Sequence, residues 1–218
     1  TYTENSLKVT ADGKELTAGT DYTLTVNKAK NEITVDFVVN NAYTLNQYQS
    51  KALVVTYAAT VNQDAALNGV ANVNDATLNF TKDSKVDGKD GSSNDKTYTY
   101  TFDIDGTADG SLTNELITKV GTTSSEQKVK LAGAEFTLYT DADLKTVYGT
   151  AYPENKQFNG VVVTDANGQM TMTGLKAGTY YLKETKAPDG YTLNDTVYTI
   201  VIDATIDETT GKLTAWSI

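Results

Sequence analysis

Apolar and polar residues alternate with a period of two through much of this chain, in short runs that end at turn residues. Residues 6–10 and 14–16 show the pattern on either side of Asp12-Gly13, a dipeptide that favours a tight hairpin because glycine tolerates positive φ. Successive side chains of a β-strand point to opposite faces, so an alternating run has one apolar face. The pattern predicts strands joined by turns, with very little helix.

The first eighty residues contain about six such runs, and short strands separated by turn signals are typical of a β-sandwich. After the first hairpin, strands are expected at 22–26, 33–37, 53–61 and 75–80, with one short helical turn at 45–48.

A polar stretch separates these strands from a second set. Residues 81–96 are rich in Gly, Ser, Asp and Lys and contain one apolar residue, Val86, which indicates a linker. Strands are expected again at 97–104, 116–120, 130–139, 178–186, 197–203 and 212–218. The sequence therefore predicts an all-β protein with two β-sandwich domains in tandem, residues 1–88 and 89–218.

One strand carries an acid on the face that its apolar residues define. The segment 178–191 begins at a turn glycine and ends at a Pro-Asp-Gly turn signal. Within it Tyr180, Leu182 and Glu184 share one face. A buried carboxylate needs a partner, so Glu184 is the candidate functional residue. In the alternative register Tyr181 faces inward and Glu184 lies at the rim in water.

Composition narrows the classes of function. The net charge is −10 and all 18 basic residues are lysine, which argues against nucleic acid and anionic membranes as partners. The chain has no histidine and no cysteine, so disulfides and a histidine-based triad or zinc site are excluded. The sequence contains no run of about 20 apolar residues, so it predicts no membrane-spanning helix. We expect no metal and no cofactor.

Three motifs together resemble one family. The segment Gly-Thr-Tyr-Tyr-Leu-Lys-Glu-Thr-Lys-Ala-Pro-Asp-Gly-Tyr at 178–191 resembles the E-box of Cna-B-type domains in sortase-assembled Gram-positive pilins, the SpaA/Cna-B-type isopeptide family. Leu-Ala-Gly-Ala-Glu-Phe-Thr-Leu-Tyr at 131–139 and the segment 163–181, with a primed-type turn expected at Asn167-Gly168, are the other two. The resemblance is close over 116–203 and looser over 1–80.

The resemblance implies a major (backbone) pilin: residues 1–88 are an Ig-like middle domain of the Cna-A type and residues 89–218 a Cna-B-type domain. It also implies a structural shaft subunit, extracellular on the cell wall or pilus, whose partners are other pilin subunits joined by a sortase, with host surface ligands as further partners. The protein is then not an enzyme, apart from a single autocatalytic turnover on itself. The runner-up is a Cna-B stalk module of a cell-wall-anchored adhesin.

In this family a glutamate assists a spontaneous amide bond between lysine and asparagine side chains, and Glu184 matches that glutamate. Lys119 matches the lysine, and Lys128 and Lys130 compete with it. Alternation leaves the direction of Lys119 open, because apolar residues flank it on both faces; the plain alternative is an edge-strand lysine that blocks aggregation. Burial disfavours the charged forms of both groups, which would give a free amine and a protonated acid.

The acceptor asparagine is unknown and is expected beyond Ile218, in the family's last strand. Within the chain Asn194, Asp203 and Asp207 are the nearest candidates of similar chemistry.

The middle domain is expected to lack its first strands and their lysine. The family's acceptor position there falls at Lys82, which leaves Asn72, Asn74 and Asn79 as fallback acceptors.

Two other classes remain as rivals. A carbohydrate-binding module would need exposed aromatic side chains on one face, whereas most tyrosines here lie in alternating strands. A glycosidase would need a second acid near Glu184, which the sequence does not place.

Overall fold

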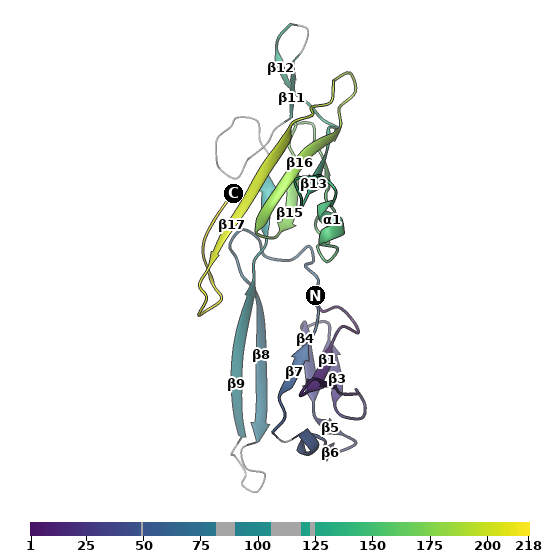
Figure 1. The fold of residues 1–218 in the computed structure, drawn as a ribbon, viewed down its shortest axis with the longest axis vertical. Coiled ribbons are helices and arrows are strands. Elements are labelled where there is room, and N and C mark those ends of the chain that lie inside the picture. The colour runs from purple at the N-terminus through teal and green to yellow at the C-terminus, as the bar shows by residue number, and fades with distance from the viewer. Residues whose placement is uncertain (49, 82–89, 106–118, 123–124) are drawn as a thin grey trace. The chain divides into compact units, whose positions relative to one another are not determined.

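The computed structural model describes residues 1–48, 50–81, 90–105, 119–122 and 125–218 (Figure 1). In this part of the chain the protein consists of strands, one 3-10 turn, η1 (Leu45–Tyr48), and one short helix, α1 (Tyr148–Ala151). The all-β class and the helical turn at 45–48 are confirmed. Neither helical segment is long or apolar enough to cross a membrane. The chain divides into two compact units, Thr1–Val61 and Asn62–Ile218.

The first unit is a set of short antiparallel strands. They are β1 (Lys8–Ala11), β2 (Lys14–Glu15), β3 (Thr23–Asn27), β4 (Glu32–Asp36), β5 (Val38–Val39), β6 (Ala42–Tyr43) and β7 (Leu53–Thr56). Strand β1 lies between β2 and β7, and β3–β4 and β5–β6 form hairpins. The turn between β1 and β2 has positive φ at both Asp12 and Gly13, as the hairpin signal predicts.

The first unit has a small core. Val9 and Ala11 on one face of β1 pack with Leu16 and Tyr22, and these are its buried apolar side chains. Strand β7 is shorter than the apolar run 53–61 predicts, and all four of its side chains are exposed.

The second unit begins with a long hairpin that corrects the expected linker. Strand β8 (Asn72–Thr81) pairs along its whole length with β9 (Asp90–Thr99). Residues 90–96 are therefore a strand, although their composition suggested a linker. The predicted domain boundary at 88/89 lies outside the described residues and stays a prediction.

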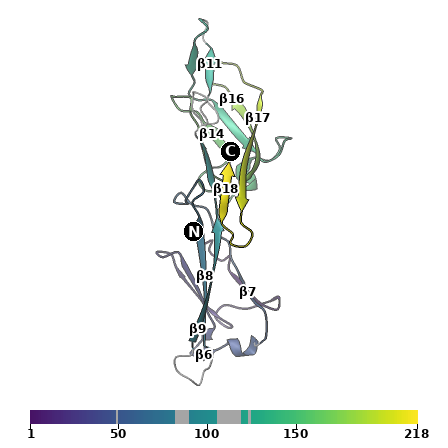
Figure 2. The same ribbon diagram turned by 90° about the vertical axis from the view of Figure 1, so that its left-hand side faces the viewer.

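The rest of the second unit is a sandwich-like arrangement of two sheets around one core. The five-stranded sheet has the order β14-β13-β16-β17-β18, and β10 pairs with β15 in the other, whereas β11 and β12 form a separate two-stranded hairpin. Figure 2 shows β18 beside β17. The elements are β10 (Phe102–Asp105), β11 (Val120–Thr122), β12 (Lys128–Lys130), β13 (Glu135–Tyr139), β14 (Val161–Val163), β15 (Thr171–Leu175), β16 (Gly178–Lys186), β17 (Val197–Ile206) and β18 (Leu213–Ser217).

The core of this unit lies between the two sheets. Alternate side chains of the five-stranded sheet meet those of β10 and β15, because each strand presents one apolar face. Tyr148 of α1 is fully buried among the rings of Tyr152, Phe158 and Tyr180. Since β16 is the middle strand of its sheet, with β13 on one side and β17 on the other, its inward face is the most enclosed.

One turn differs from the expectation. Gly168 has φ +68, but Asn167 keeps a negative φ, so the turn is not of the primed type. The Gly168 N–H donates to Asp165 O at 2.9 Å, which gives an ordinary turn closed by a left-handed glycine. The two strands that it joins, β14 and β15, belong to different sheets, so no hairpin twist selects a primed turn here.

Candidate functional site

Glu184 lies on the buried face of β16. Tyr180, Leu182 and Glu184 have exposed fractions of 1%, 0% and 1%, whereas the Tyr181 and Lys183 side chains on the other face are partly exposed. The register with Tyr181 inward is therefore excluded. Phe136, a core residue of β13, is paired with Glu184, so the acid has an apolar neighbour on the adjacent strand.

Lys119 reaches this carboxyl group from the segment just before β11. Its backbone is fixed at both ends: the N–H donates to Gly168 O, and the C=O accepts the N–H of Leu131, both at 3.2 Å. The Lys119 side chain is 11% exposed. Sequence alternation could not decide the direction of this side chain, and the register with β12 turns it inward.

The two charged groups meet directly. Lys119 Nζ lies 2.8 Å from Glu184 Oε2, and the Glu184 side chain has an exposed fraction of 0%. The backbone N–H of Asn194 donates to the same Oε2 at 2.7 Å. The other oxygen, Oε1, is buried and has no hydrogen-bond partner among the residues that the structure describes. A buried polar atom of this kind calls for an explanation.

The competing lysines lie elsewhere. Lys128 and Lys130 are at the two ends of β12, with exposed side chains. Both are strand residues, and neither forms a hydrogen bond or ion pair with Glu184 in the described part of the chain. Of the three candidates, Lys119 alone forms an ion pair with this acid in the described part of the chain.

Two of the three candidate acceptors within the second unit, Asn194 and Asp207, are committed to other bonds. The Asn194 side chain donates from Nδ2 to the Tyr198 hydroxyl at 3.0 Å and accepts the Thr196 N–H at Oδ1. Asp207 caps its own turn through the Thr210 N–H, and Asp203 is an exposed residue of β17. An acceptor beyond Ile218 stays a prediction.

The fallback acceptors of the middle domain all lie in β8. Asn72 Nδ2 donates to Ala66 O at 2.9 Å, and Asn74 Nδ2 donates to Thr97 Oγ1 at 3.2 Å. Asn79 is exposed. Lys82, which stands at the family's acceptor position, lies outside the described residues.

Sequence reasoning missed the contribution of the loop 187–196 to this site. Asn194 acts through its backbone N–H, which leaves no signal in the side-chain pattern. Tyr191 packs on Gly121, and seventy residues separate the two in the chain. The terminal tyrosine of the E-box-like segment and the small residue near Lys119 were the available signals.

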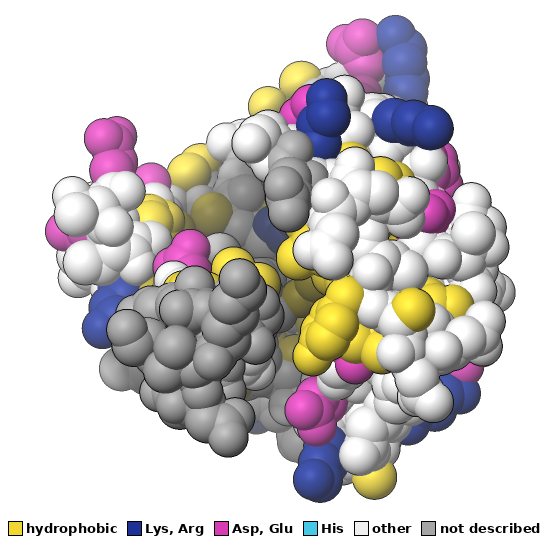
Figure 3. Space-filling view, turned by 90° about the horizontal axis from the view of Figure 1, so that it is seen from below, with side chains coloured by type: hydrophobic (Ala, Val, Ile, Leu, Met, Phe, Trp, Pro, Cys, Tyr) yellow, Lys and Arg dark blue, Asp and Glu magenta, His cyan; other side chains and the backbone are white. Residues whose placement is uncertain are grey.

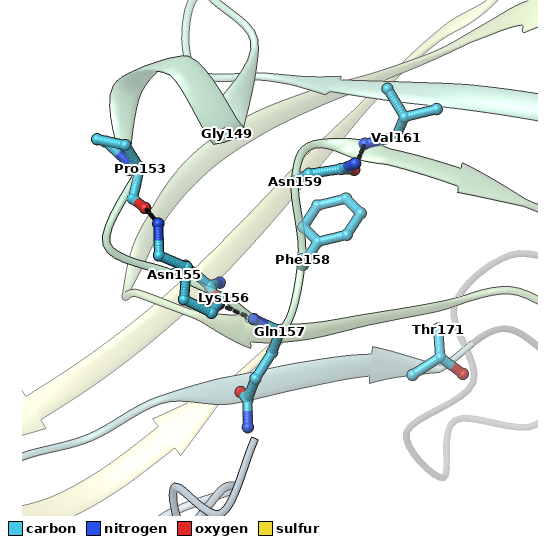
Figure 4. A pocket seen from close by; sticks show the side chains of 9 residues that line it. All are labelled: Gly149, Pro153, Asn155, Lys156, Gln157, Phe158, Asn159, Val161 and Thr171. Carbon is cyan, nitrogen blue, oxygen red and sulfur yellow. Dashed lines mark hydrogen bonds between the residues drawn. The ribbon is translucent and has the colours of Figure 1, made fainter. Parts of the chain in front are cut away.

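A surface hollow of about 600 Å³ lies beside α1 (Figure 4). Asn155 and Asn159 accept backbone N–H groups of their own loop, at 2.9 and 3.0 Å, and Lys156 donates to a carbonyl of that loop. The aromatic residue of the lining, Phe158, is 6% exposed. These side chains hold the loop in shape and present no open aromatic face, so the hollow does not favour the carbohydrate-binding alternative.

The face drawn in Figure 3 carries no large patch of one charge. Figure 3 shows lysine and acidic side chains dispersed singly or in small groups. Among the described residues, no group of three or more Asp and Glu side chains is placed to hold a metal ion.

The family and the relatives agree with this fold. A family model described as SpaA, a prealbumin-like fold domain, matches residues 116–214. The trypsin-resistant surface T6 protein of Streptococcus pyogenes serotype M6 is 30% identical over 217 residues, which cover 92% of this chain and 35% of that protein. The chain thus spans about a third of the length of this relative.

Two solved structures extend the comparison. The T6 backbone pilin of serotype M6 S. pyogenes has a TM-score of 0.58 at 26% identity, over 92% of this chain and 40% of that chain. A C-terminal fragment of the major pilin GBS80 of Streptococcus agalactiae has a TM-score of 0.62 at 23% identity, over 92% and 74%, which is a likeness of fold. Residues 116–214 therefore match the SpaA prealbumin-like domain, and the chain is homologous to the T6 backbone pilin of S. pyogenes.

Proposed function

We propose that this chain is part of the structural shaft of a covalently polymerised Gram-positive pilus, and that Lys119 forms an intramolecular amide bond with an asparagine side chain under the influence of Glu184. The homology to backbone pilins supports the structural role. The observation that carries the chemical part is the buried contact of 2.8 Å between Lys119 Nζ and Glu184 Oε2. A buried pair of opposite charge is costly to build, so it is weak evidence for stability alone.

The pair can prepare its own nucleophile. Transfer of one proton from the Lys119 ammonium to the Glu184 carboxylate leaves the net charge unchanged and gives a neutral amine and a neutral acid. A free amine is the form of lysine that attacks a carbonyl carbon.

The bond-forming step then balances without a cofactor. The amine attacks the side-chain carbonyl carbon of asparagine and a C–N bond forms. The carboxyl group shuttles the proton from the attacking nitrogen to the leaving nitrogen, the original C–N bond of the carboxamide breaks, and ammonia leaves. Packing keeps the groups in contact, which replaces a bimolecular encounter. This is one turnover on the protein itself, not enzymatic turnover on a substrate.

The unused carboxyl oxygen fits a role in this step. Oε2 already receives the Lys119 amine and the Asn194 N–H, whereas Oε1 is buried without a described partner. We propose that Oε1 carries the proton that hydrogen-bonds the carbonyl oxygen of the incoming carboxamide. Such a donor stabilises the negative charge that develops on that oxygen.

The proposed function implies a cellular location and a set of partners. A shaft subunit of this kind is extracellular, at the cell wall or in the pilus, and its partners are other pilin subunits joined by a sortase, with host surface ligands as further partners. Two domains are part of this proposal, with the predicted boundary at 88/89 lying between the paired strands β8 and β9 of the second compact unit. A covalent tie between strands carries pulling force through bonds, and it restricts the unfolded chain as a disulfide does, by roughly 2–4 kcal/mol on that analogy.

Cell-wall extracts test the structural role. We expect antibodies against this chain to detect a ladder of bands of regularly increasing mass that survives boiling in detergent. In the matched variant Lys119→Met the ladder should persist, but trypsin should digest it faster than the wild type, because polymerisation and the internal bond are separate reactions. A single band at monomer mass would contradict the shaft assignment.

A further inference from the structure

The loop after β16 folds back over the segment that carries Lys119. A methyl group added to Gly121 would lie 2.2 Å from Tyr191 Cε1 and 2.7 Å from Leu131 Cδ1. The tyrosine ring therefore rests directly on the glycine backbone, closer than any side chain at 121 would allow. Gly121 is required here for space.

This contact lies next to the reactive amine. Residues 119 and 121 are two apart in an extended segment that pairs with β12, so they share a face. Leu131, which is 6% exposed and bonds the Lys119 carbonyl, also touches this face. Tyr191 and Leu131 thus form an apolar wall beside the Lys119 side chain.

The same loop also holds the acid. The N–H of Asn194 donates to Glu184 Oε2 at 2.7 Å, and the Asn194 side chain is fixed by the Tyr198 hydroxyl at 3.0 Å. The start of the loop is closed by the Tyr191 N–H, which donates to Pro188 O at 3.1 Å. One loop of ten residues, 187–196, therefore contacts the surroundings of both reactants.

We propose that the loop 187–196 is the positioning element of the Lys119–Glu184 pair, with Tyr191 as a positioning residue that shields the amine and Gly121 as the space that Tyr191 requires. This inference rests on the proposed function of the pair. It explains why the acid and the tyrosine belong to one continuous segment: the strand supplies the carboxyl group and the following loop supplies the cover for the amine.

Acetylation by N-hydroxysuccinimidyl acetate tests the inference on residues 1–218, which end before the expected acceptor, so that Lys119 is a free amine. The extent at each lysine is read by peptide mass mapping across neutral to mildly alkaline pH, with exposed Lys130 as the internal standard. We expect Tyr191→Ala to raise the relative rate at Lys119 by about tenfold and to change its pH profile, because the amine opens to water more often. Tyr191→Phe keeps the ring and should leave both unchanged.

Two further variants separate positioning from a general loss of stability. Gly121→Ala should raise the rate at Lys119 because the ring is displaced, and the double variant Gly121→Ala/Tyr191→Ala should be no faster than Tyr191→Ala. Leu193→Ala, in the same loop but with a side chain that is 45% exposed, should match the wild type. Hydrogen exchange at the Leu138 N–H, in the core strand β13, should stay unchanged in every variant.

The outcomes distinguish this inference from the proposed function. Equal rates at Lys119 in the wild type and Tyr191→Ala, or additive effects in the double variant, would overturn the positioning role. Faster exchange at Leu138 in Tyr191→Ala would reduce the effect to global destabilisation and would overturn it too. Absence of an amide at Lys119 in the native protein would remove the proposed function while leaving the acetylation result intact.

Discussion

In residues 1–218, where Lys119 is a free amine, removing one member of the Lys119–Glu184 pair should destabilise the second unit strongly. In Lys119→Met the Glu184 carboxyl group, whose side chain is 0% exposed, keeps the Asn194 N–H as its described partner and loses its counter-charge. Truncating one partner of a buried ion pair costs about 3–5 kcal/mol. For a chain of this size each kcal/mol lowers the melting temperature by roughly 2–4 °C, so we expect a fall of about 6–20 °C.

The two single variants should lose different amounts of stability. Glu184→Gln keeps an oxygen that can accept from Lys119 Nζ, and the lysine side chain is 11% exposed, so its charge has some access to water. Its cost should lie at or below the lower end of the range, about 3 kcal/mol. The double variant Lys119→Met/Glu184→Gln contains neither charge and should be more stable than Lys119→Met alone.

Thermal and denaturant unfolding, followed by circular dichroism, measure these differences. A double-mutant cycle from the four proteins isolates the coupling between the two side chains. Additive costs, or a Lys119→Met variant as stable as the wild type, would refute the claim that the pair is buried and coupled.

Three further predictions concern the rest of the fold. Phe136 is 2% exposed, and Phe136→Ala should lower the free energy of unfolding in denaturant by about 3–5 kcal/mol. Val163 is 54% exposed, and Val163→Ala should lower it by less than about 1 kcal/mol. Equal losses would place the core elsewhere. Burial raises the pKa of Tyr180. The Tyr180 hydroxyl therefore loses its proton at lower pH in the unfolded chain than in the folded one. Its contribution to folding stability is complete below about pH 10 and is lost as pH rises towards the folded pKa. Tyrosinate absorbance that shows all tyrosines titrating together would contradict this. Backbone N–H groups of its own turn, first that of Lys145, lower the pKa of Asp141. The contribution of Asp141 to folding stability is therefore present above about pH 4 and is lost as pH falls through the folded pKa. Asp141→Ala should make unfolding less sensitive to acid. An unchanged loss of stability at low pH in this variant would contradict that role.

The sequence could predict the acid more readily than its partner. Tyr180 and Leu182 are large apolar residues on the face of Glu184, so alternation left two registers open, and the resemblance to the E-box favoured the one that buries the carboxyl group. Lys119 has apolar neighbours on both faces, and its direction depends on pairing with residues near 131 and 168. That pairing is a tertiary property that no local pattern contains.

Polar composition hides the strand at residues 90–96. These residues lack the apolar alternation of a buried strand, and their composition is that of a flexible linker. Their backbone groups nevertheless pair with β8 over a full-length antiparallel register. A strand exposed on both faces needs backbone partners rather than apolar side chains, so periodicity cannot detect it.

Mass spectrometry of the native protein tests the central claim most directly. If Lys119 forms the proposed amide, a tryptic digest should contain no cleavage after Lys119, and the peptide that carries it should be joined to an asparagine-bearing peptide with the loss of one ammonia, about 17 Da. Glu184→Ala should restore the unlinked mass. A free Lys119 peptide at its unmodified mass in the native protein would contradict the account.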